Sequence, residues 1–246
     1  FLGLKTLTIL SKAEMLIKEK NKEFNLNDIS LDNKKTFKML STGSTIGVFQ
    51  LESAGMKDVL IGLKPDRFED IIAVVSLYRP GPMENIPTYI NRKHGKEKII
   101  YMHPDLEEIL DETYGIFIYQ EQVLRAAQIL ADFSLGSADI LRRAMGKKDK
   151  NEMFEQKKSF LSGAKNKNIN ESKATEIFDQ ISAFAGYGFN KSHAAAYALI
   201  AYQTAWIKCN HPEEFFASMM TVEYNNNEKL SIFVEDLKKI NISILP

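Results

Sequence analysis

Four cationic side chains crowd into one short stretch of the sequence, at Arg142, Arg143, Lys147 and Lys148. Neighbouring residues of a helix point about 100° apart, so the two arginines could bind different oxygens of one triphosphate. The two lysines lie where the chain leaves a helix that we expect to end at Gly146. Adjacent arginines are equally common on solvated helices, so this stretch alone does not decide between phosphate binding and an ordinary surface.

A second stretch suited to anions is Gly-Tyr-Gly-Phe-Asn-Lys-Ser-His, residues 186–193. Its two glycines permit a flexible turn, and Asn190 is placed to cap a long helix that follows. The N-terminus of that helix carries Lys191, Ser192 and His193, where the helix dipole, free backbone N–H groups and side-chain donors all favour negative charge. A lone histidine is more often structural than catalytic, so His193 by itself indicates no reaction.

Aromatic residues surround this second stretch. Tyr187, Phe189 and Tyr197 could stack on a base or a sugar, and the small residues Ala194–Ala196 would let a large ligand approach closely. Aromatic residues at helical spacing more often belong to a core, so the stacking role remains one of two interpretations.

A third stretch, Leu77–Pro82, reads Leu-Tyr-Arg-Pro-Gly-Pro. Its two prolines restrict the backbone to a rigid turn that presents Arg79 at its edge. This arginine could be a further ligand contact or merely a salt-bridged turn residue. The carboxylates available as partners in the second case are Glu52, Glu69 and Asp70.

Helical periodicity predicts the elements that must position these residues. Two apolar stripes carry it: Leu7, Leu10, Ala13, Leu16 and Ile17 in the first, and Val123, Ala126, Ala127 and Leu130 in the second. We therefore expect a mainly α fold, an irregular multi-helix body with a few short β-strands. Ile46–Phe49 and Tyr114–Ile118 are the candidate strands, because both are rich in aromatic or β-branched residues and are flanked by turn residues.

Capping residues mark the expected helix ends. The N-caps are Asp32 and Asp66, the first-turn prolines are Pro104 and Pro212, and the glycines near helix ends are Gly43, Gly95 and Gly163. A change to polar residues suggests a boundary near 95–103, and a polar connector suggests another near 224–227. We accordingly divide the chain into a main domain over residues 1–224 and the start of a further segment over 225–246.

The composition is that of a cytosolic globular chain. It has 246 residues, of which 44% are hydrophobic, enough for one large domain or two small ones. No run of apolar residues is long enough to span a membrane, and no signal peptide is recognisable. A single cysteine, Cys209, excludes an internal disulfide and a cysteine-rich metal site. The net charge is zero, yet residues 142–173 hold ten Lys and Arg against four Asp and Glu, a balance that suits phosphates or nucleic acid.

Together, these stretches closely resemble the alpha subunit of bacterial DNA polymerase III, the family C replicative polymerases, in the same order and over the whole chain. Three further motifs carry the resemblance: Gly47–Ser53, Gly55–Asp58 and Tyr114–Gln122. The resemblance implies the fingers portion of such a polymerase, which binds the incoming dNTP and helps to position the primer-template. Because the chain opens at Phe1 rather than at a methionine, we expect it to be a piece of a longer polypeptide.

The resemblance also implies the site residues. Arg142 and Arg143 are expected to reach the triphosphate, with Lys147 and Lys148 as further phosphate contacts. The sugar, base and phosphates are expected to be surrounded by Tyr187, Asn190, Lys191, Ser192 and His193, with Arg79 and Tyr197 as additional contacts. Among these, His193 ranks highest.

Catalysis itself should depend on residues outside this chain. The resemblance implies Mg²⁺ ions held by carboxylates of a palm domain, so we assign no catalytic residue and no metal ligand here and expect the fragment alone to be inactive. The expected partners are dNTP, primer-template DNA and other replicase subunits, in the cytoplasm and without a membrane. Two alternatives stay open: a stand-alone basic helical module that binds nucleic acid without catalysis, and a structural helical scaffold.

Overall fold

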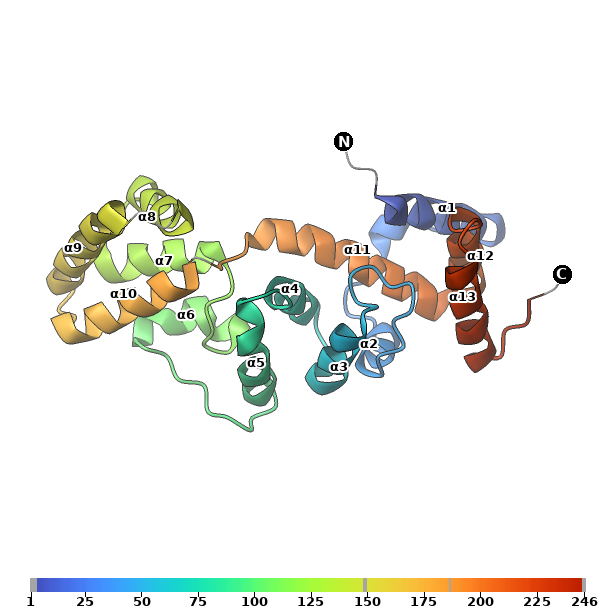
Figure 1. Cartoon of the computed structure of the whole chain (residues 1–246), viewed down its shortest axis with the longest axis horizontal. Helices are drawn as coiled ribbons and strands as arrows, with labels where there is room; N and C mark the ends of the chain where they lie inside the picture. Colours follow the sequence, from blue (N-terminus) through green and yellow to red (C-terminus); the bar gives the residue numbers. More distant parts are fainter. Residues whose placement is uncertain (1–3, 148–149, 186, 245–246) are drawn as a thin grey trace. The chain divides into compact units, whose positions relative to one another are not determined.

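The computed structural model describes residues 4–147, 150–185 and 187–244. Helices dominate these residues, from α1 (Lys5–Lys20) to α13 (Asn227–Lys239), as Figure 1 shows. The prediction of a mainly α fold is confirmed. The expected short strands are not, because the β pairing in the described part of the chain consists of one isolated parallel bridge between Tyr119 and Phe189.

Turns take the place of both expected strands. Around residues 46–49, backbone N–H groups bond to carbonyls three residues earlier, as the amide of Val48 does with Thr45 (3.0 Å). After residues 114–118, the side-chain oxygen of Gln122 accepts bonds from the amides of Ile118 (2.8 Å) and Tyr119 (2.9 Å). Because these backbone groups are satisfied locally, they do not need a neighbouring strand.

The chain divides into two compact units. Unit 1 comprises Phe1–Ile71 and Ala196–Pro246, and unit 2 comprises Ile72–Ala195. The boundaries expected near 95–103 and 224–227 fall inside unit 2 and unit 1, respectively, and stay predictions about the domains of the longer protein.

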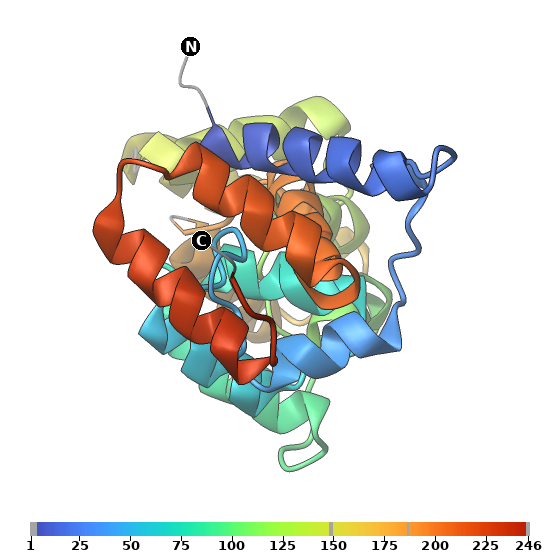
Figure 2. The same cartoon turned by 90° about the vertical axis from the view of Figure 1, so that its right-hand side faces the viewer.

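In unit 1, helix α1 packs against α12 (Pro212–Val222), and the two lie side by side in Figure 2. The predicted stripe of α1 is buried at Leu10, Ala13 and Ile17, but Leu7 is 52% exposed and Ile9 is buried instead. The other elements of this unit are η1 (Leu26–Asp28), α2 (Lys34–Ser41), α3 (Ala54–Leu63), α13 and most of α11 (Lys191–Asn210).

A buried ion pair ties three parts of unit 1 together. The ammonium of Lys208 on α11 donates to Asp236 on α13 (2.7 Å) and to the carbonyl of Ile46 (2.8 Å). The Lys208 side chain is only 5% exposed, and this burial lowers the pKa of its ammonium, although the bond to Asp236 acts in the opposite direction. A buried charge of this kind is tolerated because its hydrogen bonds are made within the protein.

Helix ends follow capping chemistry, with small shifts from expectation. Asn33, not Asp32, caps α2, because the Asn33 side chain accepts a bond from the amide of Thr36 (2.9 Å). Helix α4 (Phe68–Leu77) begins two residues after the expected cap Asp66. The first-turn prolines are where they were predicted, at Pro104 and Pro212.

Gly163 lies in the last turn of α9 (Lys150–Asn166), near a helix end as predicted, and it also has a packing role. A Cβ atom at this position would lie 2.0 Å from the carbonyl oxygen of Ala131, so a side chain would prevent α9 from approaching the end of α7 (Gln120–Ala131). Gly43 and Gly95 do follow helices, with φ of 70° and 67°.

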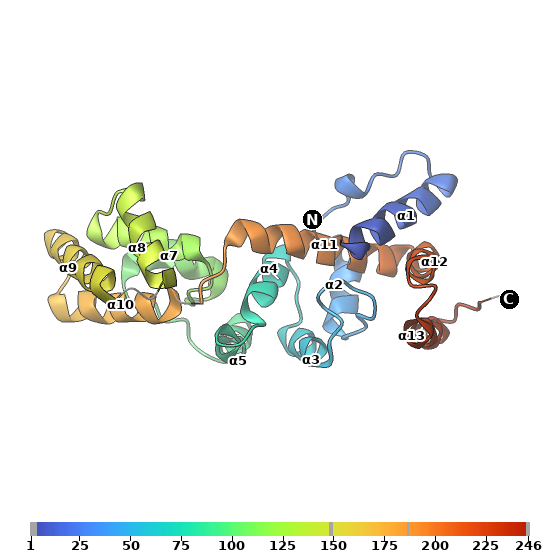
Figure 3. The same ribbon diagram turned by 45° about the horizontal axis from the view of Figure 1, so that its top comes forward.

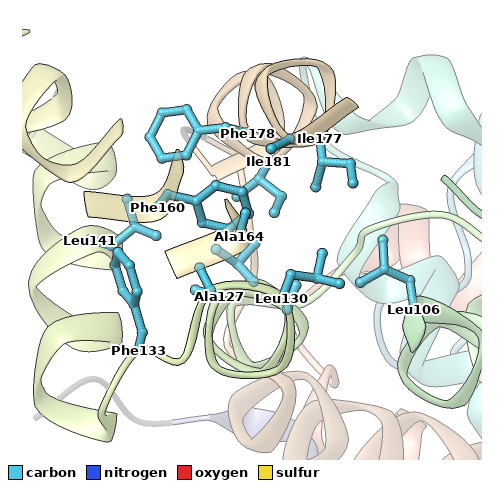
Figure 4. Close-up of a cluster of buried hydrophobic side chains, with 14 of the residues drawn as sticks. Leu106, Ala127, Leu130, Phe133, Leu141, Phe160, Ala164, Ile177, Phe178 and Ile181 are labelled. Carbon is cyan, nitrogen blue, oxygen red and sulfur yellow. The ribbon is translucent and has the colours of Figure 1, made fainter. Parts of the chain in front are cut away.

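Unit 2 gathers α7, α8 (Leu135–Lys147), α9 and α10 (Glu171–Ala185) around a second core, and these four helices lie close together in Figure 3. The predicted stripe of α7 is fully buried here. Figure 4 shows side chains from the helices of this core meeting one another: Leu106, Ala127, Leu130, Phe133, Leu141, Phe160, Ala164, Ile177, Phe178 and Ile181. The unit also contains η2 (Pro82–Asn85), α5 (Ile86–Lys93), η3 (Pro104–Leu106), α6 (Glu107–Leu110) and η4 (Asp111–Thr113).

Among the described residues, no helix combines the length and the apolar character needed to cross a bilayer.

Candidate functional site

The loop that precedes α11 is held by the turn around Arg79. The Arg79 guanidinium donates to the carbonyls of Ser76 (2.9 Å) and Tyr187 (2.8 Å), and it lies 4.3 Å from the centre of the Phe189 ring. Partial burial lowers the pKa of Arg79. The arginine therefore binds backbone carbonyls and a ring where the sequence had suggested a carboxylate partner.

The same turn supports the ring of Tyr187. Gly81 has a φ of 96°, and a Cβ atom there would lie 2.7 Å from the Tyr187 ring. Both the backbone conformation and the contact therefore require glycine. The Tyr187 ring remains 49% exposed, so it packs on the turn with one side and faces solvent with the other.

A second set of bonds ties the loop to the segment that leads into α7. The amide of Gln120 donates to the carbonyl of Phe189 (2.9 Å), and the amide of Phe189 donates to the carbonyl of Ile118 (3.2 Å). The Gln120 side chain donates to the carbonyl of Gly188 (3.1 Å). Gln122 fixes this segment in turn, since its amide group donates to Thr113 Oγ1 (2.9 Å) while its oxygen accepts the two amides described above.

The N-terminus of α11 is capped as predicted but is not open to an anion in the way the sequence suggested. Asn190 Oδ1 accepts a bond from the amide of His193 (2.8 Å). The carboxylate of Glu121 accepts from the amide of Lys191 (3.0 and 3.1 Å) and from Asn190 Nδ2 (2.8 Å). The Lys191 ammonium in turn pairs with Glu112 (2.6 Å). The expectation of free amides is therefore wrong for Lys191 and His193, because protein oxygens already accept their bonds.

The side chains that point outward from this helix start are Ser192 and His193, both exposed. The His193 ring lies 5.5 Å, centre to centre, from Phe189, which is itself in contact with Arg79. Tyr197, further along α11 in unit 1, packs its ring 5.7 Å from that of Phe49. That contact gives Tyr197 a packing role beside its predicted contact with a ligand.

Arg142 and Arg143 form a separate group on α8. Arg142 binds one oxygen of Asp139 (2.8 Å), and Arg143 binds the other (2.7 Å from Nε). Hydrogen bonds from Arg142 and, to a smaller extent, from Arg143 hold the pKa of the Asp139 carboxyl below its usual value. The arginine side chains remain 34% and 63% exposed. Lys147 is exposed at the end of α8, and the predicted contact Lys148 lies outside the described residues.

The positive balance counted along residues 142–173 is partly neutralised in space. Several of its cations pair with acidic residues that precede or follow the segment: Arg142 and Arg143 with Asp139, Lys157 with Asp179, Lys167 with Asp132, and Lys173 with Glu176. These pairs are mostly exposed, so their charges remain available to a stronger anionic ligand.

An open pocket of about 560 Å³ adjoins the Gly81 turn. Tyr187 and Phe184 line it on the side of α10 and the loop, and Thr88 and Arg92 line it from α5. Arg92 is held in place by Glu97 (2.9 Å) and by the carbonyl of Tyr114 (3.0 Å).

In the part of the chain that the structure describes, no group of three or more His, Cys, Asp or Glu side chains is placed to hold a metal ion.

Comparison with known proteins identifies the family of this chain. A family model described as the bacterial DNA polymerase III alpha subunit finger domain matches residues 6–168. The chain belongs to this family. Two of the three bonded segments, 76–82 and 112–122, lie within the residues that the fingers model matches, and 187–193 follows them.

Relatives of this fingers domain are the DNA polymerase III alpha subunits. That of Caulobacter vibrioides is 52% identical over 99% of this chain, that of Rickettsia bellii 54% identical over 100%, and that of Thermus aquaticus 52% identical over 100%. In each case the match covers 21% of the relative, so the chain spans about a fifth of the length of these proteins.

Sequence reasoning missed the residues that hold the fingers site together. Glu112, Gln120, Glu121 and Gln122 make the bonds that position the α11 N-terminus. For Gln120, Glu121 and Gln122, the signal that could have indicated this role is the Tyr-Gln-Glu-Gln sequence at 119–122, which also carries the family resemblance.

Proposed function

We propose that this fingers domain binds the incoming dNTP in a DNA-directed DNA polymerase and helps to position the primer-template. The observation that carries the proposal is the fixed start of α11, where a loop bonded to two other segments presents the exposed side chains of Ser192 and His193. A site that must recognise one sugar needs side chains held in place before the ligand arrives. This arrangement supports a role for His193 beside the sugar, with Tyr187 and Asn190 near the base and sugar.

The triphosphate is assigned to the arginines of α8, with Lys147 and Lys148 as further phosphate contacts. Arg142 and Arg143 already bind a carboxylate through their guanidinium groups, which is the geometry that binds phosphate oxygens. Arg79 and Lys191 are supporting residues in the described conformation, since both are bonded to protein oxygens.

Transfer of the nucleotide takes place on residues outside this chain. In the intact polymerase, Mg²⁺ held by palm carboxylates would supply the charge stabilisation and the activated primer hydroxyl. The fingers residues described here bind and orient the nucleotide for that step. Primer-template DNA and further replicase subunits complete the proposed assembly, which works in the cytoplasm.

The experiment that tests this proposal compares sugars. In the intact polymerase, His193→Ala should lower the preference for deoxyribonucleotides over ribonucleotides by about tenfold, because a smaller side chain leaves room for a 2′-hydroxyl. The measurement is the ratio of kcat/KM for dNTP and rNTP on one primer-template.

His193→Phe provides the matched control, since it keeps a ring of similar bulk and should preserve the preference. A histidine that only braces the loop would lower activity equally for both sugars. An unchanged ratio in His193→Ala would therefore remove His193 from the sugar site.

A further inference from the structure

Glu121 lies at the start of two helices at once. It belongs to the first turn of α7, and its carboxylate accepts bonds from Lys191 and Asn190 at the start of α11. The N-terminal end of each helix carries partial positive charge, so one carboxylate is favoured by both dipoles. The bonds join residues about seventy positions apart in the sequence.

Glu112 holds the side chain of the same lysine. Its carboxylate lies 2.6 Å from the Lys191 ammonium, which also lies 5.3 Å from the centre of the Tyr119 ring. Both members of the pair are about one-third exposed, and Tyr119 is buried. The backbone and the side chain of Lys191 are therefore fixed by two different glutamates.

The bonds to Glu121 determine where the next two residues lie. The Lys191 amide is bonded to Glu121 and the His193 amide to Asn190. Together these bonds fix the rotational orientation of the first turn of α11 about the helix axis. In this orientation, Ser192 and His193 lie on the exposed side of the helix. Without Glu121, Asn190 would keep its cap bond but lose the partner of its Nδ2 group, so the link to α7 would depend only on the bonds of Gln120 to the preceding loop.

We propose that Glu121 is a positioning residue for nucleotide binding, which acts by fixing the start of α11 and through it the orientation of His193. Glu112 assists by fixing Lys191. This inference rests on the proposed function, because it assumes that His193 contacts the nucleotide. It does not make Glu121 a ligand of the nucleotide or of a metal ion.

The bonds of Glu121 distinguish a positioning role from the alternative, in which its carboxylate only fills a phosphate site until a nucleotide displaces it. Glu121 binds a backbone amide and a side-chain amide, and the Asn190 amide cannot reverse without losing its bond to His193. A carboxylate that was displaced by each nucleotide would have to break all of these bonds in every cycle. Removing such a competitor would strengthen nucleotide binding, whereas removing a positioning residue weakens it.

The test uses the intact polymerase and measures KM for dNTP, kcat and primer-template affinity. Glu121→Ala should raise KM about tenfold, since bonds to a charged group are lost, while primer-template affinity is unchanged. Glu121→Gln should give an intermediate KM, because its amide oxygen can still accept the Lys191 bond but its amide nitrogen would face the donor of Asn190. Glu108→Ala, at an exposed position on α6, is the matched control and should leave KM unchanged.

A double-mutant cycle with His193→Ala gives the deciding readout. If Glu121 acts through His193, Glu121→Ala should raise KM much less in the His193→Ala background than in the wild type. Equal effects in both backgrounds, a lower KM in Glu121→Ala, or a KM that does not change would each overturn the inference. If His193→Ala alone alters neither KM nor sugar preference, the proposed function fails first, and the two failures are thereby distinguished.

Discussion

The α11 start and the arginine pair of α8 hold their polar groups in opposite ways. At the α11 start, Lys191 bonds to Glu112 and Glu121, and Arg79 bonds to the carbonyl of Tyr187, so each bond joins distant parts of the sequence. On α8, both arginines bind Asp139, which lies less than one turn earlier for Arg142 and about one turn earlier for Arg143.

This difference predicts which substitutions alter the stability of the fold and which alter only ligand binding. Bonds between distant segments define how the chain folds, so the residues that make them cannot change partners without cost. A local pair on an exposed helix contributes little to stability and can exchange its carboxylate for a phosphate without disturbing the fold. We therefore expect substitutions at the α11 start to affect folding and function together, and substitutions in the α8 pair to affect function alone.

The largest effect should come from the arginine pair. In the intact polymerase, Arg142→Ala or Arg143→Ala should reduce kcat/KM for dNTP by one to two decades, because each bond to phosphate contributes about 1.5–3 kcal/mol. The melting temperature and primer-template affinity should not change. Arg125→Ala, at an exposed arginine on α7, is the matched control. A fall in DNA affinity with normal nucleotide use would reassign the pair to the template duplex.

A smaller effect, on stability, should follow from Arg79→Ala. The substitution removes two bonds to carbonyls and the contact with Phe189, which should lower the free energy of unfolding by about 2 kcal/mol. Arg79→Lys should recover only part of this loss, because an ammonium cannot reproduce the planar guanidinium. Urea unfolding of the 246-residue chain measures both. If the Arg79 variants had the same urea midpoint as Arg125→Ala, the proposed difference in stability between the α11 start and the α8 pair would be wrong.

The smallest effect should be that of Asp139→Asn. Because the pKa of Asp139 is held below its usual value, its carboxylate is charged at neutral pH, and the stability it contributes is lost only as the pH falls through that lowered pKa. Removing this charge frees both arginines, so KM for dNTP should fall, but by less than about fivefold for an exposed pair. Steady-state kinetics at neutral pH checks this. A rise in KM would show that Asp139 orients the arginines for phosphate.

The helical pattern could be predicted because it depends on local chemistry. The stripe of Val123 to Leu130, the cap at Asn190 and the prolines at helix starts all follow from neighbours within one or two turns. Where two local signals compete, the sequence could not decide between them, as when Asn33 rather than the adjacent Asp32 caps α2. The expected strands failed because side-chain and turn bonds satisfy those backbone groups, which no periodicity reveals.

The candidate site could be predicted only in part. The exposed residues Ser192 and His193 lie at a helix start, as the sequence suggested, but the amides beside them are bonded to Glu121 and Asn190. The partners of Lys191 and Arg79 come from segments about seventy to one hundred positions away. One sequence does not show which distant carboxylate or carbonyl meets a given cation, so the partners suggested for Arg79 were wrong.

The rate at which the buried amine of Lys208 can be chemically modified measures how often unit 1 opens around it. Acylating reagents react only with amines that they can reach, and the Lys208 side chain is enclosed by α11, α13 and the Ile46 turn, whereas Lys12 is exposed on α1. Lys12 should therefore be acylated at once, and Lys208 only as fast as the surrounding segments separate. Peptide masses collected over time would report that opening rate directly, without any engineered label, from an amine that the sequence itself supplies.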